Sequence, residues 1–172
     1  YVALIQKALD ESRSAMLLVP EIALTPQLLG RMTAHFGKTV AVLHSSLRVG
    51  ERYDEWRRIA RGEARVVVGT RSAVFAPLQS PGLLILDEEQ EHTYKSENAP
   101  RYHAREIALY RGAKAGALVL FGSATPSIET MYLAKTGVYT LYTLKTRYNG
   151  RALPAARLID MKQELRAGND LD

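Results

Sequence analysis

The sequence predicts an α/β domain in which helices cover both faces of a mostly parallel sheet. Short apolar runs recur along its 172 residues, and several are apolar throughout, as in strands that are buried on both faces. Stretches with helical spacing of apolar residues separate these runs. Because each connection is then longer than a hairpin allows, we expect parallel strands joined by right-handed crossovers.

The expected elements alternate along the chain after a first helix. The strands are expected at residues 15–19, 39–43, 65–69, 83–86 and 117–121, with the alternating stretch 138–144 as a sixth strand and 158–160 as a further short one. The helices are expected at residues 1–9, 26–36, 49–60, 104–111 and 127–136. We assign residues 1–145 to one domain and the weakly patterned residues 146–172 to a C-terminal extension.

Two of the helices carry clear local signals. The helix over residues 26–36 is expected to begin with Thr25 as N-cap and Pro26 at its first position, and to stop at Gly37. The polar helix over residues 49–60 places Tyr53 and Trp56 on the same face as Ile59. We interpret this face as part of the core.

The composition excludes several classes of function. Without cysteine the chain has no disulfide framework, no thiolate zinc site and no cysteine nucleophile, which fits a reducing cytoplasm. No apolar run approaches membrane-spanning length, so we expect no membrane partner. The net charge of +5, from 23 basic and 18 acidic residues, permits a polyanionic partner without requiring one.

An acidic turn follows the most hydrophobic strand. Residues 83–86 are all aliphatic and run directly into Asp87-Glu88-Glu89-Gln90. Open α/β sheets bind their ligands at the carboxyl ends of the strands, where these acids would lie. As in P-loop ATPases, Asp87 would then serve the Mg²⁺ of ATP, and Glu88 would activate the attacking water. The alternative is that the acids are solvated or begin a helix, where its dipole favours negative charge.

Four polar turns follow four of the expected strands and should meet at one edge of a parallel sheet. They are Pro20-Glu21 with Thr25-Pro26-Gln27, Gly69-Thr70-Arg71-Ser72, Asp87-Glu88-Glu89-Gln90, and Gly122-Ser123-Ala124-Thr125-Pro126. In order and spacing they resemble motifs Ia, Ib, II and III of superfamily 2 helicases. The segments Val19–Gln27, 69–75, Tyr94-Lys95 and 101–105 further resemble the bacterial primosomal replication-restart DNA helicases of that superfamily.

This resemblance covers residues 1 to about 165 and implies the first RecA-like lobe of an ATP-dependent DNA helicase. It implies ATP and Mg²⁺ as cofactors, and single-stranded or forked DNA and other primosome and replication-restart proteins as partners. The family has a Walker A loop, Gly-x-x-x-x-Gly-Lys-Thr, before the helix that opens this chain. Residues 1–172 contain no such loop. We therefore expect the chain by itself to bind nucleotide weakly and to show no appreciable ATPase activity.

The resemblance also implies roles for individual residues. Asp87 would hold Mg²⁺ through water, and Glu88 would polarise the attacking water. Gln90, where the family usually has histidine, would couple the nucleotide state to the affinity for DNA. Ser123, Ala124 and Thr125 would share this role. The residues implied in nucleic-acid binding are Pro20, Glu21, Thr25, Gln27, Gly69, Thr70, Arg71, Tyr94, Lys95, Arg101, Tyr102, His103 and Arg105.

Other interpretations remain open at this point. Thr125 before Pro126 is also a helix N-cap signal, and Tyr102 could stack on an unpaired base or pack on the sheet edge. Two rival functions are a single-stranded nucleic-acid-binding module that never hydrolyses ATP, and a metal-dependent nuclease that uses Asp87, Glu88 and Glu89.

Overall fold

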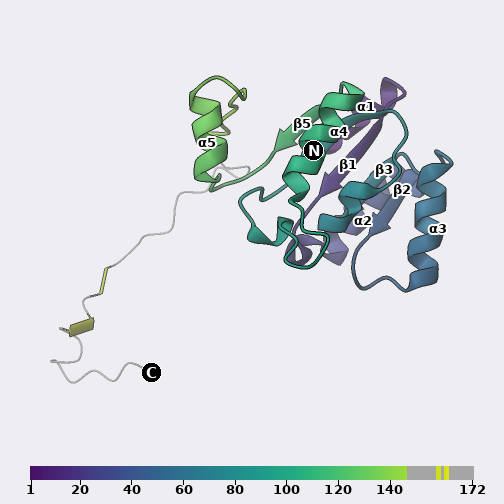
Figure 1. Cartoon of the computed structure of the whole chain (residues 1–172), viewed down its shortest axis with the longest axis horizontal. Helices are drawn as coiled ribbons and strands as arrows, with labels where there is room; N and C mark the ends of the chain where they lie inside the picture. The colour runs from purple at the N-terminus through teal and green to yellow at the C-terminus, as the bar shows by residue number, and fades with distance from the viewer. Residues whose placement is uncertain (147–157, 160, 163–172) are drawn as a thin grey trace.

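A five-stranded parallel sheet forms the centre of the computed structural model, which describes residues 1–146, 158–159 and 161–162 (Figure 1). Its strands are β1 (Ser14–Leu18), β2 (Val40–Leu43), β3 (Val66–Gly69), β4 (Pro81–Leu86) and β5 (Leu118–Phe121), in the order β2-β3-β1-β4-β5. The residues at the carboxyl ends are in register, with Leu18 beside both Gly69 and Leu86, and Leu86 beside Phe121. The predicted parallel α/β fold is confirmed.

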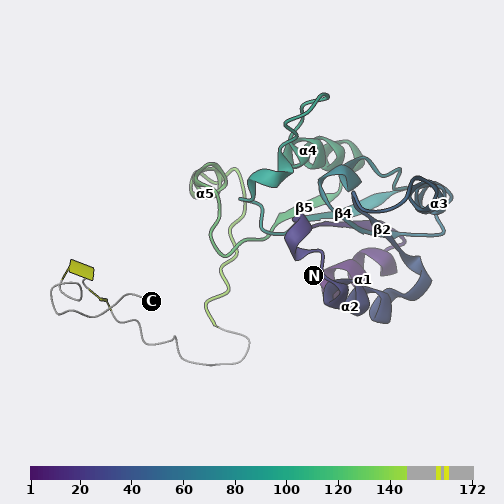
Figure 2. The ribbon, with the colours of Figure 1, turned by 90° about the horizontal axis from the view of Figure 1, so that it is seen from below.

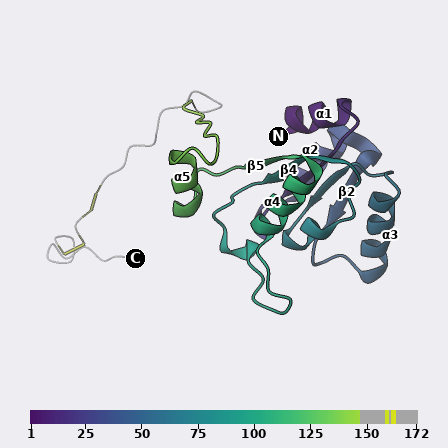
Figure 3. The ribbon, with the colours of Figure 1, turned by 45° about the horizontal axis from the view of Figure 1, so that its top comes forward.

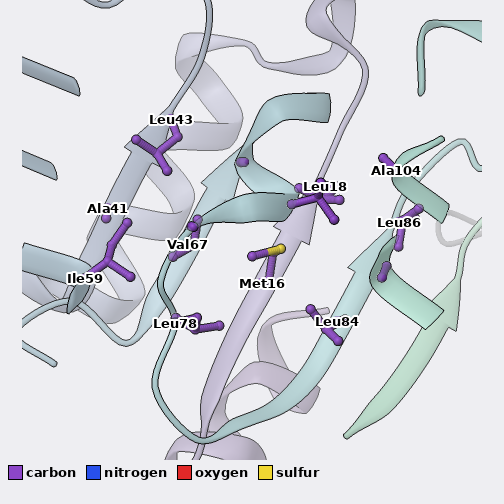
Figure 4. Packing of buried hydrophobic residues seen from close by; sticks show 14 of the residues in the cluster. Met16, Leu18, Ala41, Leu43, Ile59, Val67, Leu78, Leu84, Leu86 and Ala104 are labelled. Atoms are coloured by element: carbon purple, nitrogen blue, oxygen red, sulfur yellow. The ribbon is translucent and has the colours of Figure 1, made fainter. Parts of the chain in front are cut away.

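Helices cover both faces of the sheet (Figure 2). Helices α1 (Val2–Asp10) and α2 (Pro26–Phe36) pack on one face, where Ile5, Met32 and Val68 belong to one buried cluster. Helices α3 (Val49–Ala60) and α4 (Ala104–Ala115) pack on the other face. Figure 4 shows that second cluster, where Met16 and Leu84 line the sheet. Because the central strands β1, β3 and β4 are covered on both faces, their sequences are almost entirely apolar, and the exception, Ser14 at the start of β1, donates to Gln79 O.

The expected helix signals are present. Thr25 caps α2 by accepting a hydrogen bond from the Leu28 amide at 3.2 Å, and Gly37 ends the helix with a φ of 56°. Helix α5 (Ile128–Lys135) is capped by Ser127, which accepts from the Thr130 amide. The N-cap role left open for Thr125 is therefore taken by Ser127. Helix α5 stands apart from the layered body in Figure 1.

Two sequence predictions of packing were wrong. Residues 138–144 form no strand; Val138 is 64% exposed and Tyr142 is 82% exposed. Their alternating pattern suits a strand, but in the described part of the chain the sheet ends at β5, and Tyr139 instead packs its ring against Phe121 of that strand, with centroids 5.7 Å apart. On α3 only Ile59 is buried, whereas Tyr53 and Trp56 are 61% and 38% exposed. The reason is that α3 packs beside the edge strand β2, so the helix buries only a narrow face.

The C-terminal extension is described only in small part. Leu158 and Ile159 are exposed and have no regular secondary structure, while Asp160, the last residue of the predicted short strand, lies outside the described residues. The division of the chain at residue 145 therefore stays a prediction. Within the described residues, no helix is both long and apolar enough to cross a bilayer.

Candidate functional site

The polar turns do meet at one edge of the sheet. Backbone hydrogen bonds tie each turn to the neighbouring strand: the Asp87 amide donates to Leu18 O at 2.9 Å, and the Gly122 amide donates to Leu86 O at 2.8 Å. The Thr70 amide donates to Leu43 O at 3.0 Å in the same way. The convergence on which the functional reading of these turns depends is thus present in the structure.

Asp87 faces the start of α1. The Tyr1 hydroxyl donates a hydrogen bond to Asp87 Oδ1, and burial together with this carboxylate raises the pKa of Tyr1 above its ordinary value. Gly122 lies against the same pair, because a Cβ at this position would stand 1.9 Å from the Tyr1 hydroxyl and 3.0 Å from Asp87 Oδ1. The carboxylate is half-buried and held in one orientation at the carboxyl edge.

Glu88 begins a chain of side chains that reaches the Ser123-Ala124-Thr125 turn. Gln90 Nε2 donates to Glu88 Oε2 at 2.8 Å, and Ser123 Oγ donates to Gln90 Oε1 at 2.5 Å. The Thr125 amide in turn donates to Ser123 Oγ at 2.9 Å. Glu88 itself has a φ of 49°, which is unusual for a residue other than glycine and turns its side chain towards Gln90. We call Glu88, Gln90, Ser123 and Thr125 the relay.

Glu89 is turned away from the other two acids and is buried, with 2% of the residue exposed. Its carboxylate accepts hydrogen bonds from the Ser127 amide at 2.7 Å and from Thr130 Oγ1 at 3.0 Å. It also forms an ion pair with Arg105 Nη1 at 3.2 Å. Arg105 lies in the first turn of α4, and Ser127 caps α5. Glu89 therefore joins both helices to the acidic turn.

A pocket of about 280 Å³ opens at the same edge of the sheet. It is lined by Val19, Pro20, Glu21, Ser45, Arg52, Thr70, Arg71, Ser72, Thr93 and Tyr94. Tyr94 connects the pocket to the acidic turn, because it is one of the lining residues and its hydroxyl donates to Asp87 O at 2.7 Å and to Leu18 O at 3.0 Å. The turns after β1, β2 and β3 thus enclose a cavity that adjoins the acidic turn.

Arg71 is anchored beneath the loop that precedes α4. Its Nη1 donates to Thr93 O at 3.0 Å and to Lys95 O at 2.5 Å, and its guanidinium carbon lies 5.9 Å from the centroid of the Tyr102 ring. Its Nε is buried and has no hydrogen-bond partner among the described residues. Tyr102 is half-buried and meets Phe75 edge-to-face, with centroids 4.8 Å apart. Of the two readings left open for Tyr102, packing is the one that these contacts support.

Several residues assigned to nucleic-acid binding have structural partners instead. Tyr94 is 1% exposed, so its ring offers no open face to a base, and its assignment to nucleic-acid binding stays a prediction. Thr70 is 4% exposed and its amide donates to Leu43 O, so its assignment to nucleic-acid binding likewise stays a prediction. Arg105 is paired with Glu89. His103 caps α4 by accepting from the Arg105 amide through Nδ1 at 3.2 Å.

Other predicted contact residues lie on the surface around the pocket. Glu21, Thr25 and Gln27 are exposed, as are Lys95 and Arg101 in the loop before α4. Figure 3 shows that loop projecting from the body, closed by an antiparallel bridge between Lys95 and His103. Pro20 and Gly69 are buried and shape the turns through their backbones.

Sequence reasoning missed Tyr1, Ser45 and Arg52. Ser45 Oγ donates to Glu21 Oε1 at 2.8 Å, and Arg52 Nη2 donates to Ser45 O at 3.2 Å, so the two residues form one wall of the pocket. A signal for Ser45 existed, because it follows strand β2 as the other polar turns follow their strands. Tyr1 and Arg52 reach the site only through the packing of helices, which no local pattern shows.

Comparison with known proteins agrees with this geometry. The family model described as "DEAD/DEAH box helicase" matches residues 1–133. The chain is 51% identical over 169 residues to "Replication restart protein PriA" of Bacillus subtilis (strain 168), covering 98% of this chain and 21% of that protein. It is 45% identical over 159 residues to the protein of the same name from Treponema pallidum (strain Nichols), covering 92% and 24% respectively. The chain thus spans about a fifth to a quarter of the length of these relatives.

Among solved structures, the chain is similar to "Structure of RecG bound to three-way DNA junction", with 24% identity, a TM-score of 0.48, and coverage of 73% of this chain and 16% of that one. A sheet of parallel strands covered by helices, with Asp-Glu and Ser-Ala-Thr turns side by side, defines a RecA-like helicase lobe. The chain belongs to the DEAD/DEAH box helicase family. Its similarity to proteins named PriA confirms the resemblance drawn from the sequence.

Proposed function

We propose that this chain forms the first RecA-like lobe of an ATP-dependent DNA helicase that acts in replication restart. The observation that carries the proposal is the acidic turn at the carboxyl edge of the sheet, where Asp87 is oriented by Tyr1 and Glu88 begins the relay. Its support is the family match over residues 1–133 and the names of the relatives over nearly the whole chain. Action in replication would place the protein in the cytoplasm, with other primosome and replication-restart proteins as partners.

The two acids suit the Mg²⁺ complex of ATP. Mg²⁺ prefers hard oxygen ligands and is usually held by one or two carboxylates together with water and phosphate oxygens. Asp87 provides an oriented carboxylate of this kind, and in our proposal it holds Mg²⁺ through water. Glu88, which accepts a hydrogen bond from Gln90, would polarise the water that attacks the γ-phosphate. The Mg²⁺ of ATP, when bound, neutralises charge that develops on the phosphates.

In this proposal the relay couples ATP hydrolysis at Glu88 to DNA binding. When the partners of Glu88 change between nucleotide states, its bond to Gln90 changes with them, and Gln90 is bonded directly to Ser123. Gln90 can serve here although the family usually has histidine, because its amide donates on one side and accepts on the other. Ser123, Ala124 and Thr125 then lie between the acids and α5.

The pocket is the proposed start of the single-strand groove. Arg71 contributes a guanidinium with a buried, unpartnered Nε, and Glu21 and Ser45 offer polar atoms on the opposite wall. Exposed Thr25 and Gln27 extend the groove beside η1 (Glu21–Ala23), and Lys95 with Arg101 extends it along the projecting loop. Phosphate contacts by such residues position a strand without reading its sequence.

The decisive experiment is DNA-stimulated ATP hydrolysis by the protein as its gene encodes it. We expect Glu88→Gln to lower turnover by roughly a hundredfold or more while ATP still binds, since general-base catalysis contributes about 10²–10⁴-fold. Glu63→Gln, at an exposed carboxylate distant in sequence from the acidic turn, is the control and should leave turnover unchanged. Unaltered hydrolysis in Glu88→Gln would contradict the proposal.

The 172-residue chain alone should hydrolyse no appreciable ATP, because it contains no Walker A loop to hold the phosphates. Magnesium-dependent turnover by the purified chain would show that its nucleotide site differs from the one proposed. A binding module that never hydrolyses ATP would instead hold single strands in the Asp87→Ala variant and show no turnover in the protein encoded by the whole gene.

A further inference from the structure

Helix α3 exposes an apolar stripe that the proposed function does not use. Val49, Tyr53 and Trp56 are 84%, 61% and 38% exposed and follow one another at spacings of four and three residues. Residues at these spacings lie side by side on a helix, so the three side chains form one continuous strip, here called the α3 stripe. The sequence suggested that Tyr53 and Trp56 were core residues, but the sheet is covered without them.

Arginines border the α3 stripe on both sides. Arg52 precedes Trp56 by four residues and also lines the pocket, which makes the stripe continuous with that cavity. On the other side, the guanidinium carbon of Arg57 lies 5.5 Å from the centroid of the Tyr53 ring. Over four residues a helix rises about 6 Å, so a chain leaving the pocket past Arg52 meets the Trp56 ring within roughly that distance.

The acidic residues of α3 are engaged or directed elsewhere. Glu51 accepts a hydrogen bond from the Arg48 amide at 2.9 Å at the start of the helix, and Glu55 is paired with Arg58 at 2.7 Å. Asp54 is one position from Tyr53 and two from Trp56, spacings that do not share a helix face. Asp54 lies three residues before Arg57 and so neighbours that arginine, whereas Glu55 is paired with Arg58 and leaves the flank at Arg52 cationic. The partner at that flank, next to the pocket, should be anionic.

From this geometry we propose that the α3 stripe binds single-stranded nucleic acid that leaves the pocket, with unpaired bases stacked on Trp56 and Tyr53. Aromatic faces combined with cations that follow the phosphates are the means by which proteins hold single strands without sequence preference. The inference rests on the proposed function, because it takes the pocket to be the start of the strand groove. It adds a base-stacking surface on α3 to that groove.

The sequence contains a single tryptophan, so emission excited at a wavelength where its nine tyrosines do not absorb reports on Trp56 alone. We expect titration with an oligothymidylate of about 15 nucleotides at low salt to quench this emission saturably. The affinity should fall linearly with salt on logarithmic axes, as counterions are released from the strand. A duplex of the same length, whose bases are already stacked, should produce little quenching.

Variants separate stacking from simple apolar contact, with affinity measured by the anisotropy of a labelled oligothymidylate. Trp56→Leu should weaken binding about tenfold, within the range for losing a base-stacking ring, while Trp56→Phe should stay within about threefold of the native chain. Tyr110→Leu removes an exposed aromatic residue from α4 and should bind like the native chain. Circular dichroism checks that each variant is folded.

The failure of this inference can be told from the failure of the proposed function. Saturable binding with unchanged emission and native affinity in Trp56→Leu, but weakened binding in Arg71→Gln, would overturn the α3 stripe and leave the pocket in place. Concentration-dependent dimers that mask Trp56 would overturn it in favour of a second copy of the chain. An absence of binding at low salt would overturn both the stripe and the groove.

Discussion

Replacing Glu89 by alanine should remove the main attachment of α5 to the domain. The carboxylate is 1% exposed and accepts hydrogen bonds from the Ser127 amide, Ser127 Oγ and Thr130 Oγ1 at 2.7, 3.2 and 3.0 Å, besides its ion pair with Arg105 at 3.2 Å. Breaking a buried ion pair by deleting one partner costs about 3–5 kcal/mol, because the other charge stays desolvated. Arg105 is only 19% exposed, which puts it in this class.

We therefore expect Glu89→Ala to lower the free energy of unfolding by about 3–5 kcal/mol in urea denaturation followed by circular dichroism. The matched control is Glu63→Ala, which breaks the exposed Arg61–Glu63 pair, whose side chains are 58% and 53% exposed. That change should cost no more than about 1 kcal/mol. A double-mutant cycle with Arg105→Ala should give a coupling of about 1–3 kcal/mol.

Hydrogen exchange tests the location of the effect. Amides of α5 should exchange faster in Glu89→Ala, whereas amides of the central strands should follow only the change in global stability. A loss in Glu89→Ala no larger than in Glu63→Ala would refute the reasoning, and so would unchanged protection of α5.

Three further predictions follow from buried contacts. Tyr94→Phe should cost about 1–3 kcal/mol in urea denaturation, because two carbonyls lose their donor, yet leave oligonucleotide affinity unchanged since the ring is 1% exposed. Burial, then the neighbouring guanidinium, lower the pKa of His103 below 6.5, so its contribution to stability is complete above that pH and is lost as the pH falls through the folded pKa. His103→Asn, which can cap without titrating, should show a smaller loss of unfolding free energy between about pH 7.5 and about pH 5.5, and an equal loss would count against this assignment. Gly122→Ala should destabilise by about 1–3 kcal/mol because its Cβ would meet the Tyr1 hydroxyl at 1.9 Å, whereas Gly30→Ala in α2, with nothing within 4 Å, should stabilise by about 0.5–1 kcal/mol in thermal unfolding.

The strands, most helices and the shared edge could be predicted because each depends on a local signal. Apolar runs buried on both faces identify parallel strands, and the N-cap and C-cap at Thr25 and Gly37 set the ends of α2. The acids at Asp87 and Glu88 follow from the strand that precedes them. Since parallel strands end together, the order of the turns already placed them in one site.

The environment of individual side chains could not be predicted in this way. Tyr94 and Arg105 have the composition of a nucleic-acid-binding loop, yet one is fixed by carbonyls of β1 and Asp87 and the other by Glu89. The Leu18 carbonyl that holds Tyr94 is distant in sequence. The Glu89 carboxylate that holds Arg105 faces inward only because of the backbone geometry of the acidic turn. Trp56 was expected in the core but is exposed. Helical spacing reveals which residues share a face, but not whether the sheet is wide enough to cover that face.

The three consecutive acids show why this distinction matters for function. A metal-dependent nuclease would need Asp87, Glu88 and Glu89 to converge on shared ions. Instead Asp87 meets Tyr1 at the start of α1, Glu88 at a φ of 49° meets Gln90, and Glu89 is buried against α4 and α5. Within the described residues, no group of three or more potential metal-ligating side chains of this kind comes together. A positive φ outside glycine costs of order 1–3 kcal/mol and persists where the surrounding structure enforces it. At Glu88 the surrounding hydrogen bonds hold that conformation, and the three acids meet different partners, which fits separate roles better than a metal site shared by all three.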